Sequence, residues 1–131
     1  MAVKSLFITI IFITNILTFE TAITPGEKEL GMMYRQDWGN IDGMLFFNEA
    51  PRRVSYWMKN TTIPMTMWYL DSNLNLLESY NPAVLSTDLV ISSNTNIKYV
   101  LEIKPTLTNI ILRDYPVFKK KLSEKVLKIK N

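Results

Sequence analysis

Short apolar runs separated by turn residues place the strongest constraint on the fold of this chain. Runs rich in aromatic and β-branched residues, bounded by Gly, Asn, Asp, Ser and Pro, are typical of β-strands. The sequence contains five such runs beyond residue 40: Met44–Phe47, Val54–Met58, Met65–Leu70, Leu74–Tyr80 and Ile97–Ile103. Asp71-Ser72-Asn73 lies between two of them and predicts a hairpin turn. No repeat or linker interrupts the pattern, so we expect a single mostly β domain over residues 16–131.

The N-terminal run supports two competing predictions. Lys4 precedes fifteen uncharged residues, Ser5–Phe19, which have the outline of a secretory signal and are short for a membrane-spanning helix. The same run is dominated by Ile, Phe and Thr, which suit strands. We favour a signal peptide or membrane anchor over residues 1–15, with a first strand near Ile16–Ala22. The protein is therefore expected to be secreted, periplasmic or membrane-anchored.

A short helix is predicted near the front of the domain. Thr24-Pro25-Gly26-Glu27 combines an N-cap hydroxyl, a proline in the first turn and a glutamate three residues after the cap. Leu30, Met33 and Tyr34 then follow at helical spacing and form one apolar face. We expect this helix to end near Arg35.

The C-terminal region predicts a second short helix and leaves its last part open. Thr106–Arg113 has apolar residues at helical spacing, which indicates a short helix. For residues 119–131 the spacing of Phe118, Leu122, Val126 and Ile129 suits a helix, whereas the alternation of Leu127 and Ile129 with lysines suits a strand.

The absence of histidine and cysteine excludes several classes of function. Imidazole general bases, Ser-His-Asp and Cys-His nucleophiles, disulfides and Cys/His zinc sites all require these residues. A metal could be held only by oxygen ligands. We predict no metal and no cofactor, and we regard the remaining polar residues as better suited to binding than to proton transfer at neutral pH.

Positive charge is concentrated at the C-terminal end. The chain has a net charge of +3, and residues 113–131 contain seven basic and two acidic residues. Such a tail can contact the phosphate groups of lipid or nucleic acid, but we interpret it first as a solvated surface. No RNA-binding aromatic motif or recognition helix accompanies the lysines, so we predict no nucleic-acid partner and retain membrane association as an alternative.

Four motifs in the middle of the chain resemble a known family. They occur in the order Leu30–Arg35 (LGMMYR), Asp42–Phe47 (DGMLFF), Tyr56–Met65 (YWMKNTTIPM) and Tyr99–Glu102 (YVLE). This pattern is similar to the family called domain of unknown function 192, from about Phe19 to the C-terminus. The resemblance implies a compact β-sandwich or jelly-roll-like domain, often behind a signal peptide or membrane anchor, and it implies no established activity.

The chain departs from the family pattern at three places. Thr66 stands where the family usually has an aspartate, which removes one candidate carboxylate. The glycine-rich closing segment of the family is absent, and Ser72-Asn73 replaces a turn glycine.

Five polar or aromatic residues of the motifs form the candidate ligand-binding site. They are Arg35, Trp57, Lys59, Asn60 and Glu102. Arginine and lysine suit anionic groups, asparagine both donates and accepts hydrogen bonds, and tryptophan offers a flat apolar wall. The alternative is that Arg35 and Glu102 pair with each other and fix the front helix to the sheet. We favour this ion pair because charged residues inside a small domain are rarely unpaired.

Three functional hypotheses follow. The preferred one is a non-enzymatic, envelope-associated module that binds a small molecule or a protein partner and has no catalytic residues. The second is a hydrolase or lyase that uses Glu102 or Asp71 together with Lys59. The third is a membrane-surface protein attached by its N-terminal run and its basic tail.

Overall fold

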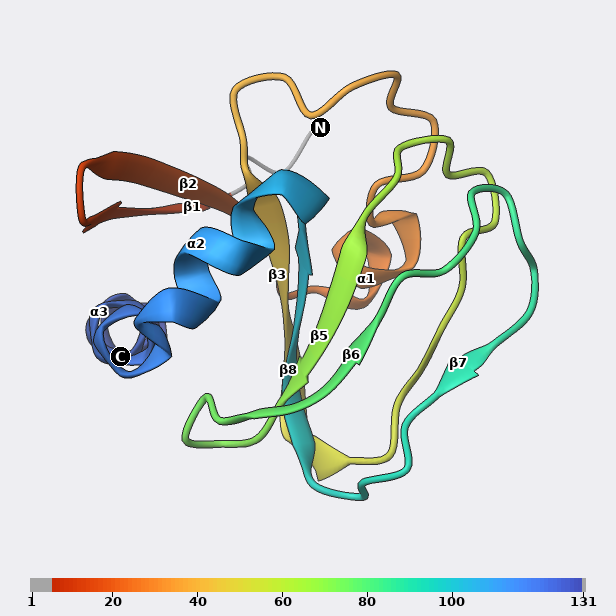
Figure 1. Cartoon of the computed structure of the whole chain (residues 1–131). Coiled ribbons are helices and arrows are strands. Elements are labelled where there is room, and N and C mark those ends of the chain that lie inside the picture. The colour runs from red at the N-terminus through yellow and green to blue at the C-terminus, as the bar shows by residue number, and fades with distance from the viewer. Residues whose placement is uncertain (1–5, 131) are drawn as a thin grey trace.

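A six-stranded mixed sheet forms the centre of the protein (Figure 1). The computed structural model describes residues 6–130, with the strand order β1-β2-β3-β8-β5-β6. Strands β2 and β3 are parallel, and every other neighbouring pair in this sheet is antiparallel. The strands of this sheet are β1 (Phe7–Phe12), β2 (Asn15–Ala22), β3 (Gly43–Arg52), β5 (Thr66–Leu70), β6 (Leu76–Tyr80) and β8 (Ile97–Ile103).

Different elements cover the two faces of this sheet. Figure 1 shows α2 (Thr108–Arg113) and α3 (Tyr115–Lys130) on one side, and α1 (Pro25–Leu30) with β7 (Val90–Ile91) on the other. Strand β7 pairs with β4 (Ser55–Tyr56) in a separate two-stranded sheet. The mostly β prediction is confirmed. Within residues 6–130 no closed sandwich or jelly roll is formed, because helices cover one side of the large sheet, and α1 with a sheet of only two short strands covers the other.

Alternate residues of the central strands supply two separate cores. Leu45, Trp68 and Leu101 belong to the core beneath α2 and α3. Their strand neighbours, including Phe46, Met67 and Val100, belong to the core on the α1 side. Because both faces are covered, the central strands are apolar on both sides, and a polar residue within them becomes buried.

The N-terminal run includes a strand of the sheet. Strand β1 pairs with β2 from Phe7↔Glu20 to Phe12↔Asn15. Phe12 is fully buried and its ring meets that of Phe118 on α3 edge to face, with centroids 5.8 Å apart. No helix among the described residues is long and apolar enough to cross a membrane. The signal or anchor assigned to residues 1–15 stays a prediction, and residues 1–5 lie outside the described part.

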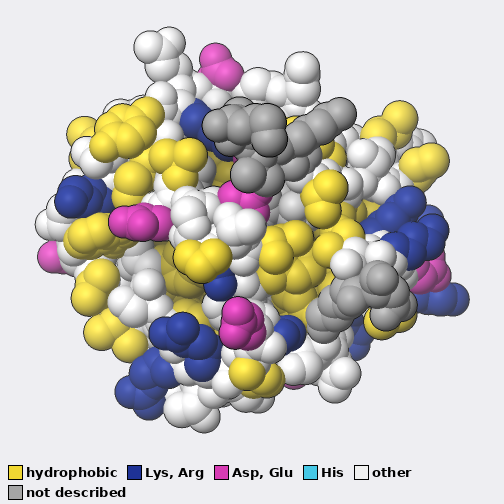
Figure 2. Space-filling model, turned by 180° about the vertical axis from the view of Figure 1, so that it is seen from behind, with side chains coloured by type: hydrophobic (Ala, Val, Ile, Leu, Met, Phe, Trp, Pro, Cys, Tyr) yellow, Lys and Arg dark blue, Asp and Glu magenta, His cyan; other side chains and the backbone are white. Residues whose placement is uncertain are grey.

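The opposite side of this hairpin exposes apolar side chains. Ile11 and Ile16 face each other across the strand pair, and both are more than 60% exposed. Figure 2, seen from behind, shows that hydrophobic side chains reach the surface in patches between charged ones.

Helix α1 begins as predicted and ends earlier than predicted. The Thr24 hydroxyl accepts a hydrogen bond from the Glu27 amide at 3.1 Å, and the Glu27 carboxylate accepts one from the Thr24 amide at 3.0 Å. The helix ends at Leu30 because Gly31 follows with φ +48°, a conformation that favours glycine. Arg35 therefore lies in a loop, and the predicted apolar face is wrong because Leu30 and Tyr34 are exposed.

The C-terminal segment, for which the sequence pattern left helix and strand open, forms the helix α3. Phe118, Leu122 and Val126 of α3 are buried against the sheet, at the spacing of one helical face. The predicted second short helix is present as α2, preceded by a 3-10 turn at Pro105–Leu107.

Candidate functional site

A pocket of about 650 Å³ opens on the α1 side of the sheet. Its buried base is formed by β3 and β8, one wall by β4, and its rim by α1 and the loop that follows β4. This volume lies in the range of small-molecule sites.

Glu102 is the buried acidic residue at the base of the pocket. It lies on β8 in register with Met44 of β3 and Met67 of β5, and it is 4% exposed. No hydrogen bond or ion pair joins its side chain to another residue of the described part of the chain. Burial alone raises the pKa of this carboxyl to about 8, so Glu102 is mostly protonated at neutral pH.

A glycine lets the strands approach closely beside Glu102. A Cβ atom added to Gly43 would lie 2.5 Å from the backbone oxygen of Glu102 and 3.2 Å from the Phe19 ring. Gly43 is thus required because the backbone of β8 lies too close for a side chain, next to the base of the pocket. Gly31, in contrast, is favoured by its positive φ of +48°.

Tyr56 and Arg52 form an electrostatic group with Glu102. Burial raises the pKa of the Tyr56 hydroxyl, the negative charge of Glu102 raises it further, and the positive charge of Arg52 opposes this. The Tyr56 hydroxyl makes no hydrogen bond to a described residue, whereas Tyr69 below it donates to the Val90 carbonyl at 2.6 Å. The base of the pocket therefore offers two polar groups, Glu102 and Tyr56, that are free to bond a small molecule.

The Trp-Met-Lys-Asn motif forms the rim. Trp57 is 39% exposed, and the Lys59 ammonium lies over its ring, 5.2 Å from the centroid. Asn60 has φ +54°, its carbonyl accepts the Tyr34 amide at 2.9 Å, and its side-chain amide donates to the Tyr34 hydroxyl at 2.8 Å. Asn60 therefore holds the loop after α1 against the motif, and it contributes to the rim mainly by fixing that loop.

A second loop fixes the motif from its other side. The Met58 amide donates to the Ser86 carbonyl, and the Leu85 amide donates to the Thr61 carbonyl, each at 2.9 Å. Because three loops are joined by backbone hydrogen bonds, Trp57 and Lys59 occupy defined positions over the pocket.

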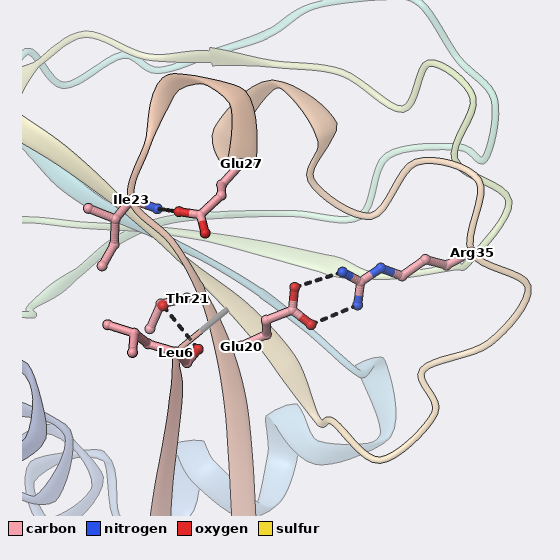
Figure 3. Close-up of polar contacts among 6 residues, drawn as sticks. All are labelled: Leu6, Glu20, Thr21, Ile23, Glu27 and Arg35. Atoms are coloured by element: carbon pink, nitrogen blue, oxygen red, sulfur yellow. Dashed lines mark hydrogen bonds and ion pairs between the residues drawn. The ribbon is translucent and has the colours of Figure 1, made fainter. Parts of the chain in front are cut away.

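Arg35 lies outside the pocket. Its guanidinium donates two hydrogen bonds to Glu20 on β2, at 3.0 and 2.7 Å (Figure 3). The favoured Arg35–Glu102 ion pair is therefore wrong. The parallel pairing of β2 with β3 places Glu20 on the α1 side of the sheet, where it meets the loop that carries Arg35. The structural role is retained, because this pair fixes the loop after α1 to the sheet.

Asp71 is also remote from the pocket. Its carboxylate accepts the amides of Asn73 and Asn75 and the Asn75 side-chain amide, which confirms the hairpin turn. Leu70 pairs with Tyr99, so Asp71 lies about four residues, roughly 13 Å, along the sheet from Glu102. A carboxylate pair of Glu102 with Asp71 is not formed.

Four of the five predicted site residues line one pocket, and the prediction missed two others. Trp57, Lys59, Asn60 and Glu102 all contribute to its surface. The missed residues are Arg52 and Tyr56. Tyr56 belongs to the recognised motif, and a tyrosine adjoining Trp57 in a short strand was the signal that could have identified it.

No metal or cofactor site is evident in the described structure. No group of three or more acidic side chains that could hold a metal ion occurs within residues 6–130. Glu102 is the only carboxyl at the buried base of the pocket, because the other lining carboxyl, Glu29, is exposed on α1.

Comparison with known proteins gives a family and two similar structures. The family model described as "DUF192: Uncharacterized ACR, COG1430" matches residues 9–110, so the match begins within β1 and ends within α2. The motif resemblance is confirmed, but the match stops short of the C-terminus. No protein of curated function matches the chain.

Both similar structures share the fold over most of their length. A protein of Sinorhizobium meliloti 1021, described as a putative transcription regulator, is 33% identical with a TM-score of 0.67, over 79% of this chain and 81% of its own. A protein of unknown function from Novosphingobium aromaticivorans DSM 12444 is 23% identical with a TM-score of 0.66, over 82% of this chain and 78% of its own. The second likeness concerns the fold alone.

Proposed function

Because the chain belongs to the DUF192 family, which is described as uncharacterized, its function has to be inferred from its own pocket, and we propose that it is a small-molecule-binding module. The observation that carries the proposal is Glu102, a buried carboxyl that faces the pocket without a protein partner. No fully enclosed side-chain polar atom of the described residues lacks a hydrogen-bond partner, so the unbonded oxygens of Glu102 are open to the pocket, where a ligand can bond to them.

The arrangement of the rim supports binding. Trp57 supplies a flat apolar wall and Lys59 a positive charge, and neither is buried in the core. The loops that carry them are joined through Asn60 and Thr61 to two neighbouring loops. Preorganisation of this kind reduces the entropy lost on binding.

Binding is tested by titrating the isotope-labelled protein with a mixed set of anionic, cationic and neutral fragments, followed by NMR. We expect shifts of the amide signals of residues 54–60 and 102. A Trp57→Ala, Lys59→Ala variant should bind the same fragments at least tenfold more weakly, because it lacks both the wall and the charge. Lys120→Ala is the matched control, because Lys120 is an exposed lysine of α3 on the opposite side of the sheet. Fragments that shift only other regions, or that bind the double variant equally well, would refute the proposal.

Acid catalysis by Glu102 is the second candidate. A carboxyl with a pKa near 8 is protonated at neutral pH and can act as a general acid. We rank it below binding because the described pocket offers Glu102 no carboxylate partner, and no ion pair joins it to Lys59. Hydrolysis of chromogenic ester and glycoside substrates that disappears in Glu102→Gln would favour this candidate.

Envelope association remains part of our proposal and rests on the sequence. Cleavage after residue 15 would remove β1 and with it Ile8, Ile10 and Phe12 from the core beneath α3. We therefore propose that, if the protein enters the envelope, it keeps its N-terminal run. The intact mass of the protein purified from a cell envelope tests this, since a mass that lacks residues 1–15 contradicts a retained strand.

A nucleic-acid partner is not part of the proposal, although one similar structure is described as a putative transcription regulator. The basic helix α3 packs along the sheet through Phe118, Leu122 and Val126, and the pocket lies on the other face. Gel-shift titration with duplex DNA at near-physiological salt should show no retained complex.

A further inference from the structure

The charges around the pocket determine which ligand charge it favours. We propose that the pocket binds a small organic carboxylate with an apolar body. The carboxylate would accept hydrogen bonds from the protonated Glu102 and from the Tyr56 hydroxyl, while the apolar body lies against Trp57. This inference rests on the proposed binding function and names its ligand class.

Positive charge dominates the lining of the pocket. Lys28, Arg52 and Lys59 are the cationic residues of the lining, and Glu29 and Glu102 are its carboxyls. With Glu102 protonated, the lining has two more positive than negative charges, although residues 1–112 as a whole contain eight basic and ten acidic residues. An anion entering the pocket is attracted by this local field.

Hydrogen-bond donors converge at the base. Burial keeps Glu102 protonated, so that its carboxyl can donate as well as accept. Arg52 acts electrostatically on the same tyrosine, Tyr56, as Glu102 does. An O–H donor bonding to a carboxylate forms a strong, charge-assisted hydrogen bond. Two O–H donors, with the positive charge of the exposed Arg52 acting on one of them, are suited to a single carboxylate group.

A cationic ligand fits the pocket less well. Glu102 would have to lose its proton before it could pair with a cation, which is unfavourable at pH 7 because its pKa is about 8. The cation would also be repelled by the three cationic residues of the lining. The Lys59 ammonium over the Trp57 ring places a positive charge where a cationic ligand would stack, and this charge repels a cation.

The proposal is tested with three aromatic probes of similar size: benzoate, phenyltrimethylammonium and benzamide. We expect benzoate to bind at least tenfold more tightly than benzamide at pH 7, and phenyltrimethylammonium not to bind. Arg52→Gln and Lys59→Gln should each weaken benzoate several-fold, whereas Lys120→Gln should have no effect. NMR shifts of the residue 102 and Tyr56 signals locate the bound probe.

The pH dependence tests the orientation of the carboxylate. Tyr56 and Tyr69 interact electrostatically with Glu102, and burial raises the pKa of both tyrosines further above neutrality. The other charged or titratable residues that line the pocket are Lys28, Glu29, Tyr34, Arg52 and Lys59. The chain has no histidine, so Glu102 is the pocket group that titrates in this range. If only protonated Glu102 binds benzoate, the apparent Kd rises about tenfold from pH 7 to pH 9.

Glu102→Gln provides the decisive variant. Its neutral amide should bind benzoate about threefold more weakly than wild type at pH 7, because an N–H donor replaces the O–H. The affinity of the variant should be the same at pH 9 as at pH 7, so at pH 9 it should bind benzoate about threefold more tightly than wild type. The two proteins therefore exchange rank between pH 7 and pH 9.

The outcomes separate this inference from the binding function. Pocket shifts with phenyltrimethylammonium but not benzoate overturn the ligand class and leave the binding function standing. A benzoate affinity independent of pH in wild type overturns the contact with Glu102. If neither these probes nor the fragment set shifts pocket signals, the binding function itself fails.

Discussion

Replacing Glu102 by glutamine should remove most of the pH dependence of folding stability between pH 5 and pH 8. The pKa of Glu102 is raised from the ordinary value of 4.5 to about 8 by burial. Between these values the folded protein keeps a proton that the unfolded chain releases. The contribution of Glu102 to the free energy of unfolding is therefore fully present below pH 4.5 and is lost as the pH rises toward 8.

The magnitude follows from one proton per molecule. With one proton released on unfolding, each pH unit lowers the free energy of unfolding by about 1.4 kcal/mol, so the interval from pH 4.5 to pH 8 lowers it by about 5 kcal/mol. Glutamine has nearly the same shape and no charge. Glu102→Gln should therefore match wild type near pH 4.5 and exceed it in stability by several kcal/mol at pH 9.

Equilibrium urea unfolding at five pH values from 5 to 9, at one ionic strength, measures this difference. Glu124→Gln on the exposed side of α3 is the control, because its carboxyl is solvated in the folded and unfolded states. If wild-type stability is constant across this range, or if Glu102→Gln declines in parallel with it, then Glu102 is not a buried neutral acid.

Three further variants test the contacts that shape the site, each by urea unfolding. Gly43→Ala should cost more than about 2 kcal/mol, because its Cβ would meet the backbone at 2.5 Å, whereas Gly26→Ala, with nothing within 4 Å, should be close to neutral. Arg35→Gln should cost about 1–3 kcal/mol by leaving Glu20, whose side chain is 12% exposed, without its bidentate partner, and equal stability would contradict that pair. Glu78→Gln should lower stability at pH 7 and reduce the loss that wild type shows as the pH falls from 4.5 to about 2. Burial of Glu78 raises its pKa, but hydrogen bonds from Tyr80, Ser93 and Asn94 outweigh this and hold it at about 2.

The parts of the fold governed by local chemistry could be predicted from the sequence. Strand β8 has the predicted bounds, Ile97–Ile103, because β-branched and aromatic residues fill a run that ends before a proline. The capping box at Thr24 forms as expected, since it depends only on residues three positions apart. The end of α1 was missed because the glycine conformation at Gly31 ends the helix before its apolar spacing does.

The parts governed by distant contacts could not be predicted. Spacing alone left residues 119–131 between helix and strand, and the burial of Phe118 against β1 favours the helix. The partner of Arg35 was misassigned because Glu20 becomes its neighbour only through the parallel pairing of β2 with β3. The pairing register of two strands that lie far apart in the sequence cannot be predicted from the residue pattern within either strand.

Glu102 shows how a site residue can be recognised from strand patterning before its partners are known. Strand β8 is apolar at Leu101 and Ile103, which face one core, and at Val100, which faces the other. A strand covered on both faces has no solvated position for a carboxylate. An acidic side chain that occurs there must therefore be ion-paired, protonated or bound to a ligand. In this chain the arginine expected to pair with it binds Glu20 instead, and the carboxyl opens into a pocket. A lone acidic residue within a two-sided apolar strand is therefore a stronger indication of a ligand site than the basic residues near it, which can find partners elsewhere.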